Sequence, residues 1–389
     1  MEGLRATIEA LAPLERSSGT AGEREAADWI AARLEDLGCD ASVDEESAYD
    51  SFAVPVAGMS AIGAAAGVMA LSRRGRLAGA ALSALAAAGL ADDVANGARW
   101  FRRATMKSKP TWNVVAEAGD RAAARTLVVL AHHDAARSGR VFDQSLQRWL
   151  GDRFPGIIER IDTSLPLWWP VVGAPAGVSV AALRRQSGLT AAAASVCLLA
   201  TAALADIARS PIVPGANDNL TAVAALVAVA EYLREQPLTG LRVLLVSCGS
   251  EETLQGGARA FAARHFAALD REQTWVLNLE TIGSPELMML EGEGTLVMED
   301  YHGRGFRDLV ARAADRARIP VRRGMRARSS TDAVITSRAG YPTATLSSMD
   351  RYKALSNYHQ MTDTPDNVRY ETVAAATGVV DAVARELAG

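Results

Sequence analysis

The chain has 389 residues, of which 49% are hydrophobic and 22% are charged, so it can bury the core of one large domain or of several smaller ones. Its 41 basic and 45 acidic residues leave a net charge of -4 without a basic face, which argues against a nucleic-acid partner. Three cysteines, Cys39, Cys197 and Cys248, are too widely spaced for a disulfide framework or a thiolate zinc site, and this favours a cytoplasmic location. The first residues mix acidic and basic side chains and do not predict a cleavable secretory signal.

The first predicted element is an amphipathic helix over residues 22–37, which ends at Gly38. Short apolar runs then alternate with helical patterns, with strands expected at 126–131, 241–247, 274–279 and 343–348 and helices at 220–234 and 256–269. This alternation predicts an α/β fold, a mostly parallel mixed sheet with helices on both faces.

Two stretches interrupt that alternation. Residues 52–71 and 77–91 are uncharged, rich in Ala and Gly, and separated by the turn SRRGR, and residues 164–183 and 186–205 repeat the arrangement around two arginines. Each pair predicts a hairpin of two apolar helices. We therefore expect a main domain of residues 1–50, 105–163 and 209–389, with hairpin insertions at 51–104 and 164–208.

Side chains that can bind metal ions follow the predicted strands directly. They are His132, His133 and Asp134 after the first strand, Glu251 and Glu252 after the second, and Glu280 after the third; Asp218 begins a helix in PGANDN, and His359 lies in the late loop NYHQMTDTPDN. Open parallel sheets bind ligands at this edge. With one ligand from each of these five groups, the site has two imidazoles and three carboxylates. That set suits Zn²⁺ better than Ca²⁺ or Mg²⁺, and the odd carboxylate, Asp218, can bridge two ions.

Each of these residues alone has an ordinary explanation. A single histidine at a strand end is commonly structural, Glu251 with Glu252 is commonly a solvated pair, and Asp218 is by default a helix cap. Their joint placement is what indicates a site. His265 and His302 have no carboxylate pattern around them, and we expect them to be structural.

Five motifs carry a family resemblance. In order along the chain, AHHD, PGANDNLTAVAAL, SEETLQGG, LNLETIGS and NYHQMTDTPDN resemble the signatures of the di-zinc aminopeptidase family, which includes bacterial leucyl aminopeptidases, glutamate carboxypeptidase II and glutaminyl cyclases. The opening SSGTAGEREAADWIAARLEDLG is similar to the first helix of that family. The resemblance covers nearly all of the chain except the two apolar hairpins. It implies a zinc exopeptidase fold and an aminopeptidase that acts on peptide or aminoacyl substrates.

The resemblance also implies roles for single residues and two Zn²⁺ ions per chain. His132 and Glu280 would bind one ion, Glu252 and His359 the other, and Asp218 both, while Asp134 would orient His132 and Glu251 would be the general base. His133 competes for the place of His132, which the His-x-Asp spacing favours. Two positions depart from the family: Glu280 stands where many members have Asp, and Ala333 replaces the His of an Asp-His pair, so Asp332 receives no role.

Other functions fit parts of the pattern. A carboxypeptidase, a dipeptidase or an amidohydrolase would use the same metal site, a glutaminyl cyclase-like transferase would use a single zinc, and a receptor or scaffold would use none. The complete ligand set argues against the last two. Side-chain preference and oligomeric state are not predicted.

The apolar hairpins predict a membrane anchor. Each helix has about 15 to 20 uncharged residues, close to the ~20 that span a bilayer, and aromatic residues near the helix ends resemble interfacial anchors, namely Trp100, Phe101, Trp168 and Trp169. A soluble, Ala-rich lid or dimer interface in a cytoplasmic protein is the alternative. Arginines at the hairpin tips pull the tips toward the cytoplasm, whereas Arg99, Arg102, Arg103, Lys107 and Lys109 and the lack of an export signal favour a cytoplasmic catalytic domain.

Overall fold

The computed structural model describes residues 1–389, with the side chain of Ile157 left aside. The longer helices are α1 (Glu2–Leu11), α2 (Ala21–Asp36), α3 (Ala53–Leu71), α4 (Arg76–Val94), α6 (Ser145–Arg153), α8 (Trp168–Leu183), α9 (Ser187–Arg209), α10 (Thr221–Glu235), α11 (Gly256–His265), α12 (Arg304–Arg316) and α14 (Tyr370–Ala388). Three helices are short: α5 (Trp100–Thr105), α7 (Pro155–Arg160) and α13 (Ala333–Arg338). The strands are β1 (Asp40–Ala48), β2 (Lys109–Gly119), β3 (Thr126–His132), β4 (Arg242–Cys248), β5 (Thr274–Glu280), β6 (Glu286–Glu293), β7 (Glu299–Asp300), β8 (Arg322–Ala327) and β9 (Thr343–Met349).

One sheet of nine strands forms the centre of the main domain. Its order is β1-β2-β4-β3-β5-β9-β6-β7, and β8 pairs with β6. The four central strands β4, β3, β5 and β9 are mutually parallel, whereas β1, β2 and the β6 side add antiparallel pairs. The predicted α/β fold with a mixed sheet is therefore confirmed, with most of the parallel pairs in the middle and one more between β6 and β8.

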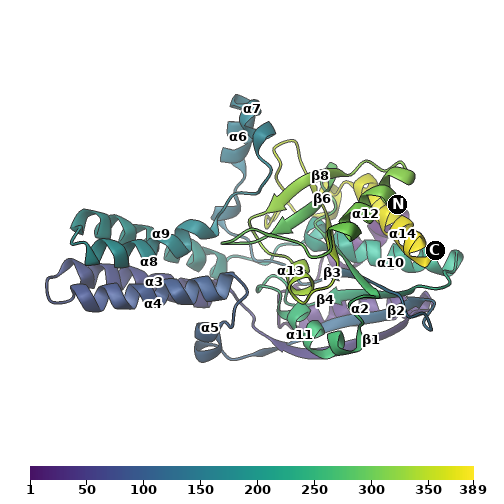
Figure 1. Ribbon diagram of the computed structural model, residues 1–389, viewed down its shortest axis with the longest axis horizontal. Coiled ribbons are helices and arrows are strands. Elements are labelled where there is room, and N and C mark those ends of the chain that lie inside the picture. The colour runs from purple at the N-terminus through teal and green to yellow at the C-terminus, as the bar shows by residue number, and fades with distance from the viewer.

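Helices cover both faces of this sheet. On β3, Leu127 and Val129 face the large core formed with α1, α2, α10, α12 and α14, while Val128 and Leu130 face a smaller core with α11 and α13. Because both faces of β3 are buried, its sequence is a continuous apolar run rather than an alternating one. The main domain is thus a three-layer structure (Figure 1).

The predicted opening helix is α2. The Thr20 hydroxyl oxygen accepts the backbone N–H of Glu23 at the start of α2, and Gly38 follows its end with a positive φ of 86°. These are an N-cap and a glycine stop. The helices expected at 220–234 and 256–269 are α10 and α11, the second shorter than predicted.

Several strands are absent from the sequence prediction. The edge strand β1 has the sequence DASVDEESA, whose four acidic residues hide its pairing with β2. Charged edges are common because they prevent further strand pairing. Strands β2, β6, β7 and β8 were also missed, and β7 has only two residues.

The apolar segments form the helices α3, α4, α8 and α9, which pack against one another as a four-helix bundle. The bundle projects from the main domain, and the helices α6 and α7 form a separate arm beside its base (Figure 1). Small residues permit the close packing: a Cβ atom on Gly67 would lie 2.5 Å from the Cβ of Ala194, and one on Gly79 would lie 2.4 Å from the Ala66 carbonyl oxygen.

Candidate metal site

The carboxyl ends of the central strands bring the predicted residues together. His132 is the last residue of β3 and pairs in register with Cys248, the last residue of β4, while Glu280 ends the neighbouring β5. Glu251 and Glu252 follow β4 within one turn. Because these strands are parallel, their ends meet at one edge of the sheet, as the sequence predicts.

The side chains divide into two groups that share Asp218. Nε2 of His132 lies 3.5 Å from Oδ1 of Asp218 and 3.5 Å from Oε1 of Glu280. Nε2 of His359 lies 3.3 Å from the other oxygen of Asp218, Oδ2, and 3.2 Å from Oε2 of Glu252. Each group therefore has one imidazole, one carboxylate of its own and one oxygen of Asp218.

These groups fit metal ions. Buried nitrogen and oxygen atoms of all five residues, including Nε2 of both histidines, have no hydrogen-bond partner in the protein. Ligands about 2.0 to 2.1 Å from a tetrahedral Zn²⁺ lie about 3.3 Å apart, and the contacts within each group have that spacing. Unsatisfied buried polar atoms are costly, and two cations would satisfy them.

The carboxylates around the two histidines also favour positive charge at this site. Burial alone would lower the pKa of both histidines, but their carboxylate neighbours raise the pKa of His132 well above its usual value and that of His359 to about 10. Burial raises the pKa of Glu252 to about 7, whereas bonds to both histidines hold the pKa of Asp218 far below its usual value. The carboxylates therefore favour a positive charge at this place, which bound metal ions would supply in place of protons.

Glu251 stands beside both groups without belonging to either. Its Oε1 accepts a hydrogen bond of 2.7 Å from Nε2 of Gln255, and its Oε2 lies 3.9 Å from Nε2 of His132. Burial, followed by the nearby carboxylates, raises the pKa of Glu251 well above its usual value. A buried carboxyl group with a raised pKa beside a metal site is a candidate acid or base.

Residues 200–384 match the family model described as peptidase family M28. This part of the chain, just under half of its length, is similar to peptidase family M28. The matched residues include Asp218, Glu251, Glu252, Glu280 and His359, and the structure adds His132 from β3 to them. The chain is thus a peptidase, and its cluster of ligand atoms makes it a metallopeptidase, in agreement with the resemblance of the five motifs.

Solved structures share the fold of this chain. An aminopeptidase from Aneurinibacillus sp. strain AM-1 has a TM-score of 0.55 and 15% identity, covering 98% of this chain and 92% of that one. BSAP, a zinc aminopeptidase from Bacillus subtilis, has a TM-score of 0.56 and 13% identity, covering 99% of this chain and 94% of that one. A glutaminyl cyclase from Bacteroides thetaiotaomicron has a TM-score of 0.56 and 12% identity, covering 99% of this chain and 97% of that one. Such distant similarities establish the fold alone. The sequence has no match among curated proteins.

Asp134 links the ends of β3 and β4. Its Oδ1 accepts the backbone N–H of Glu251 at 2.9 Å and lies 3.4 Å from Nδ1 of His132, which is too long for a strong hydrogen bond. Its Oδ2 accepts the N–H of Glu252 at 3.1 Å and the hydroxyl of Ser18 at 2.7 Å. Asp134 therefore fixes the loop that carries Glu251 and Glu252 as well as facing His132.

The sequence analysis missed Asp363, which positions the shared carboxylate. Asp363 Oδ1 accepts the backbone N–H of Asn217 at 2.8 Å, and its Oδ2 accepts that of Asp218 at 3.1 Å. The residues on either side of Asp218 are also held in place, because the side-chain oxygens of Asn217 and Asn219 accept backbone N–H groups of the loop after β5. The motif TDTPDN contained this signal, but the sequence does not show which of its two aspartates faces Asp218.

A buried arginine was also missed. Arg16 is fully buried and donates to the carbonyl oxygens of His133 and Gly215, each at 2.8 Å. It joins the loop after β3 to the segment that precedes Asp218. Burial lowers its pKa to about 10, against the opposing effect of Asp363, Asp134 and Asp218, so it remains a cation near an acidic site.

His133, the competing ligand candidate, and Asp332, which received no predicted role, lie beside the predicted ligands in the chain or in the fold. Nδ1 of His133 lies 2.9 Å from the Ser247 hydroxyl, and burial lowers the pKa of His133 to about 4. Asp332 is buried, its pKa is raised to about 8 chiefly by burial, and both of its carboxylate oxygens lack a hydrogen-bond partner.

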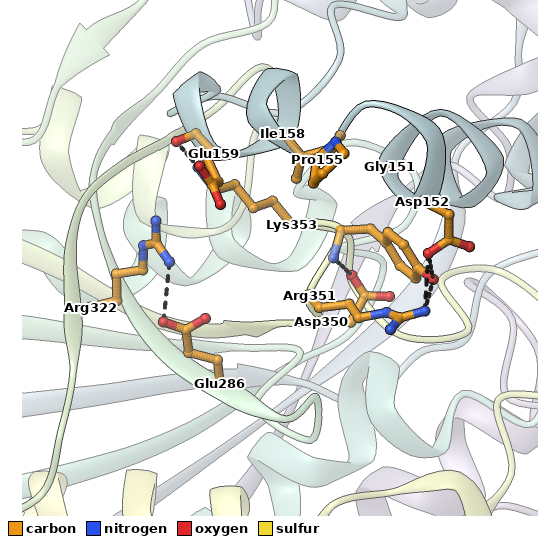
Figure 2. A pocket seen from close by; sticks show the side chains of 11 residues that line it. Gly151, Asp152, Pro155, Ile158, Glu159, Glu286, Arg322, Asp350, Arg351 and Lys353 are labelled. Atoms are coloured by element: carbon orange, nitrogen blue, oxygen red, sulfur yellow. Dashed lines mark hydrogen bonds and ion pairs between the residues drawn. The ribbon is translucent and has the colours of Figure 1, made fainter.

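A surface pocket lies elsewhere, between the α6–α7 arm and the loop after β9 (Figure 2). Asp152 binds both Arg351 and the Tyr352 hydroxyl there, at 3.1 and 2.8 Å, and Lys353 donates to the Glu159 carbonyl at 2.9 Å. Among the described side chains, none of the seven predicted site residues lines it. Arg351 and Arg322 pair with Asp152 and Glu286, and Lys353 binds backbone carbonyl oxygens, so we assign the pocket no ligand.

Proposed function

We propose that the protein is a zinc aminopeptidase that binds two Zn²⁺ ions per chain and hydrolyses the first peptide bond of its substrates. One observation carries the proposal: the two oxygens of Asp218 face two separate pairs, His132 with Glu280 and His359 with Glu252. Such a division supports a bridging carboxylate. We assign Glu251 as general base and Asp134 as the residue that orients His132 and the Glu251 loop.

When bound, two such cations lower the pKa of a water and polarise the scissile carbonyl. The chain supplies the proton transfer. Oε1 of Glu251 is held by Gln255, so Oε2, on the His132 side, is free to take a proton from the attacking water. The same oxygen then returns the proton to the nitrogen of the leaving amine, as general acid–base catalysis requires.

The first prediction concerns which end of a peptide substrate the enzyme cleaves. An aminopeptidase requires a free N-terminus, so unblocked aminoacyl amides and peptides should be hydrolysed while their N-acetylated forms should resist. The measurement is release of the leaving amine from matched blocked and unblocked substrates, with Glu251→Gln as the inactive control. Cleavage of acetylated peptides from the C-terminal end would favour a carboxypeptidase, and cyclisation of N-terminal glutamine would favour a cyclase.

We also propose that residues 51–104 and 164–208 form a membrane anchor. The helices α3, α4 and α9 are long and apolar enough to cross a bilayer, whereas α8 has 16 residues. Among the described side chains, thirteen of the twenty-five exposed large apolar ones lie on the four bundle helices, for example Val68, Leu77, Leu183 and Leu199. Large residues outside and small residues inside are typical of helices that pack within lipid.

The ends of the bundle support a membrane position. Its far end has the exposed residues Arg73, Arg74, Arg184 and Arg185, and 19-residue helices span about 28 Å, close to the ~30 Å of a bilayer core. At the base, however, two cations used to predict orientation are buried within the protein. Arg102 pairs with Asp93, and Arg99 binds the Leu254 carbonyl. They cannot serve as membrane-flanking charges, so that part of the orientation argument was wrong.

Membrane attachment is the second prediction. The full chain should remain in the membrane fraction after a carbonate wash and should require detergent for release. Replacing exposed apolar residues by serine, as in Leu198→Ser with Leu199→Ser, should weaken the attachment, whereas Val297→Ser on the main domain should not. Recovery of active wild-type protein without detergent would contradict the anchor and favour a soluble helical lid.

A further inference from the structure

The base of the apolar bundle contacts the loop that carries Glu251. Beyond α4, Arg102 donates to the Thr253 carbonyl oxygen at 2.7 Å, and Arg99 donates to that of Leu254. Both arginines are buried. Buried residues of the insertion therefore contact the loop that carries Glu251, beside the candidate catalytic centre.

This loop has a backbone that needs outside support. Ser250, Leu254 and Gln255 have φ angles of 48°, 72° and 59°, in the left-handed region that residues other than glycine seldom adopt. Such conformations persist where the surrounding structure holds them. The contacts from Arg102 and Arg99 fall on the carbonyls of Thr253 and Leu254, in the middle of this segment. Residues of the insertion thus help to set the direction of the Gln255 side chain.

A chain of side-chain hydrogen bonds continues from there to Glu251. Oδ1 of Asn96, just after α4, accepts from Arg99 at 2.6 Å and from Arg259 at 3.3 Å. Nδ2 of Asn96 donates to Oε1 of Gln255 at 2.8 Å, and Nε2 of Gln255 donates to Oε1 of Glu251 at 2.7 Å. Three successive bonds therefore lead from either arginine to the carboxylate of Glu251.

The direction of these bonds is fixed at both ends. Guanidinium groups only donate, so the Asn96 oxygen must face Arg99 and Arg259, and its nitrogen must face Gln255. At the other end, Nε2 of Gln255 also donates to the Ser330 carbonyl oxygen at 2.9 Å, and a carbonyl oxygen only accepts. The amide of Gln255 can satisfy its neighbours in one orientation alone, the one that directs N–H toward Glu251.

We propose that Gln255 is a positioning residue for Glu251 and that Asn96, at the end of an apolar helix, sets the orientation of Gln255. The proposal rests on the proposed role of Glu251 as general base. By holding Oε1, Gln255 leaves Oε2 directed toward His132, where a proton would be taken up. The apolar insertion therefore completes the geometry of the base.

Asn96→Asp tests this with almost no change of shape. The new carboxylate can still pair with Arg99 and Arg259, so the fold should remain intact. Its second oxygen, however, would face Oε1 of Gln255, and two acceptors cannot share a hydrogen bond. Gln255 must then lose this partner or turn its oxygen toward Glu251. We expect kcat to fall about tenfold or more, a fraction of what general-base catalysis provides, with KM and metal content unchanged.

The matched control is Asp92→Asn, the reverse exchange at the same end of α4. Asp92 accepts the backbone N–H groups of Ala98 and Trp100 and has no bond to Gln255. We expect its kcat to remain near that of the wild type. Gln255→Leu, which keeps the volume and removes the bonds to Asn96 and Glu251 together, should lower kcat as Asn96→Asp does.

The decisive comparison places Asn96→Asp in the Glu251→Gln background. A positioning role predicts that the effect of Asn96→Asp on residual turnover disappears there, because no base remains to be positioned. An equal decrease in both backgrounds, or wild-type kcat in Asn96→Asp alone, would overturn the proposal while leaving Glu251 as base. Wild-type turnover in Glu251→Gln would instead refute the role of Glu251 and, with it, this inference.

Discussion

Glu251→Gln should lower kcat by at least about 100-fold and leave the metal content unchanged. General-base catalysis contributes about 10² to 10⁴ in rate, and the amide keeps the size of the side chain while losing the basic oxygen. The metal should stay because Glu251 Oε2 is 3.9 Å from His132, outside the two groups that share Asp218. Turnover of an unblocked aminoacyl amide, with elemental analysis of the same sample, provides the measurement.

The neighbouring residue supplies the control. Glu252→Gln removes a carboxylate whose Oε2 lies 3.2 Å from Nε2 of His359, so this variant should bind less zinc, and added zinc should partly restore its activity. If Glu251→Gln were the variant that lost metal and recovered with added zinc, the roles of the two glutamates would have to be exchanged.

Asp218→Asn should abolish activity by releasing metal. Among the described side chains, Asp218 alone has a carboxylate within 4 Å of both histidines, at 3.5 and 3.3 Å. A neutral amide cannot balance two dications. Replacing even a partner of a metal ligand costs about 10- to 100-fold in affinity, so loss of the shared ligand should cost more than about 100-fold. Zinc titration of the chelator-treated protein measures this.

A surface aspartate of the same size serves as its control. Asp366 is 87% exposed and pairs only with Arg5 at 3.3 Å, so Asp366→Asn should keep wild-type zinc affinity. Circular dichroism of both variants separates loss of metal from loss of fold. Wild-type zinc affinity in folded Asp218→Asn would contradict its bridging role.

Much of the fold and of the site follows from local sequence. Buried parallel strands are continuous apolar runs, so β3, β4, β5 and β9 could be recognised, and the residues after them had to meet at one edge of the sheet. That reasoning places His132, Glu251 and Glu280 together, as the structure does. The boundaries of the apolar helices were similarly predictable, because nothing but composition and charge defines them.

The residues whose roles the sequence did not predict act through contacts between distant segments of the chain. Asp363 and Arg16 support Asp218 and the loop after β3 through backbone groups, and a backbone contact leaves no pattern in the sequence. Asn96 and Gln255 are 159 positions apart and look like ordinary polar residues until the bundle base is placed on the loop after β4. Arg99 and Arg102 were misjudged for the same reason, since a basic residue beside an apolar helix is usually exposed.

The zinc content of the wild-type chain tests the central claim most directly. Protein purified without chelator, supplemented with zinc and freed of excess metal should contain close to two zinc ions per chain by elemental analysis, because two groups of ligands share Asp218. Folded protein that contains no zinc under these conditions would contradict the metal site and the aminopeptidase proposal together.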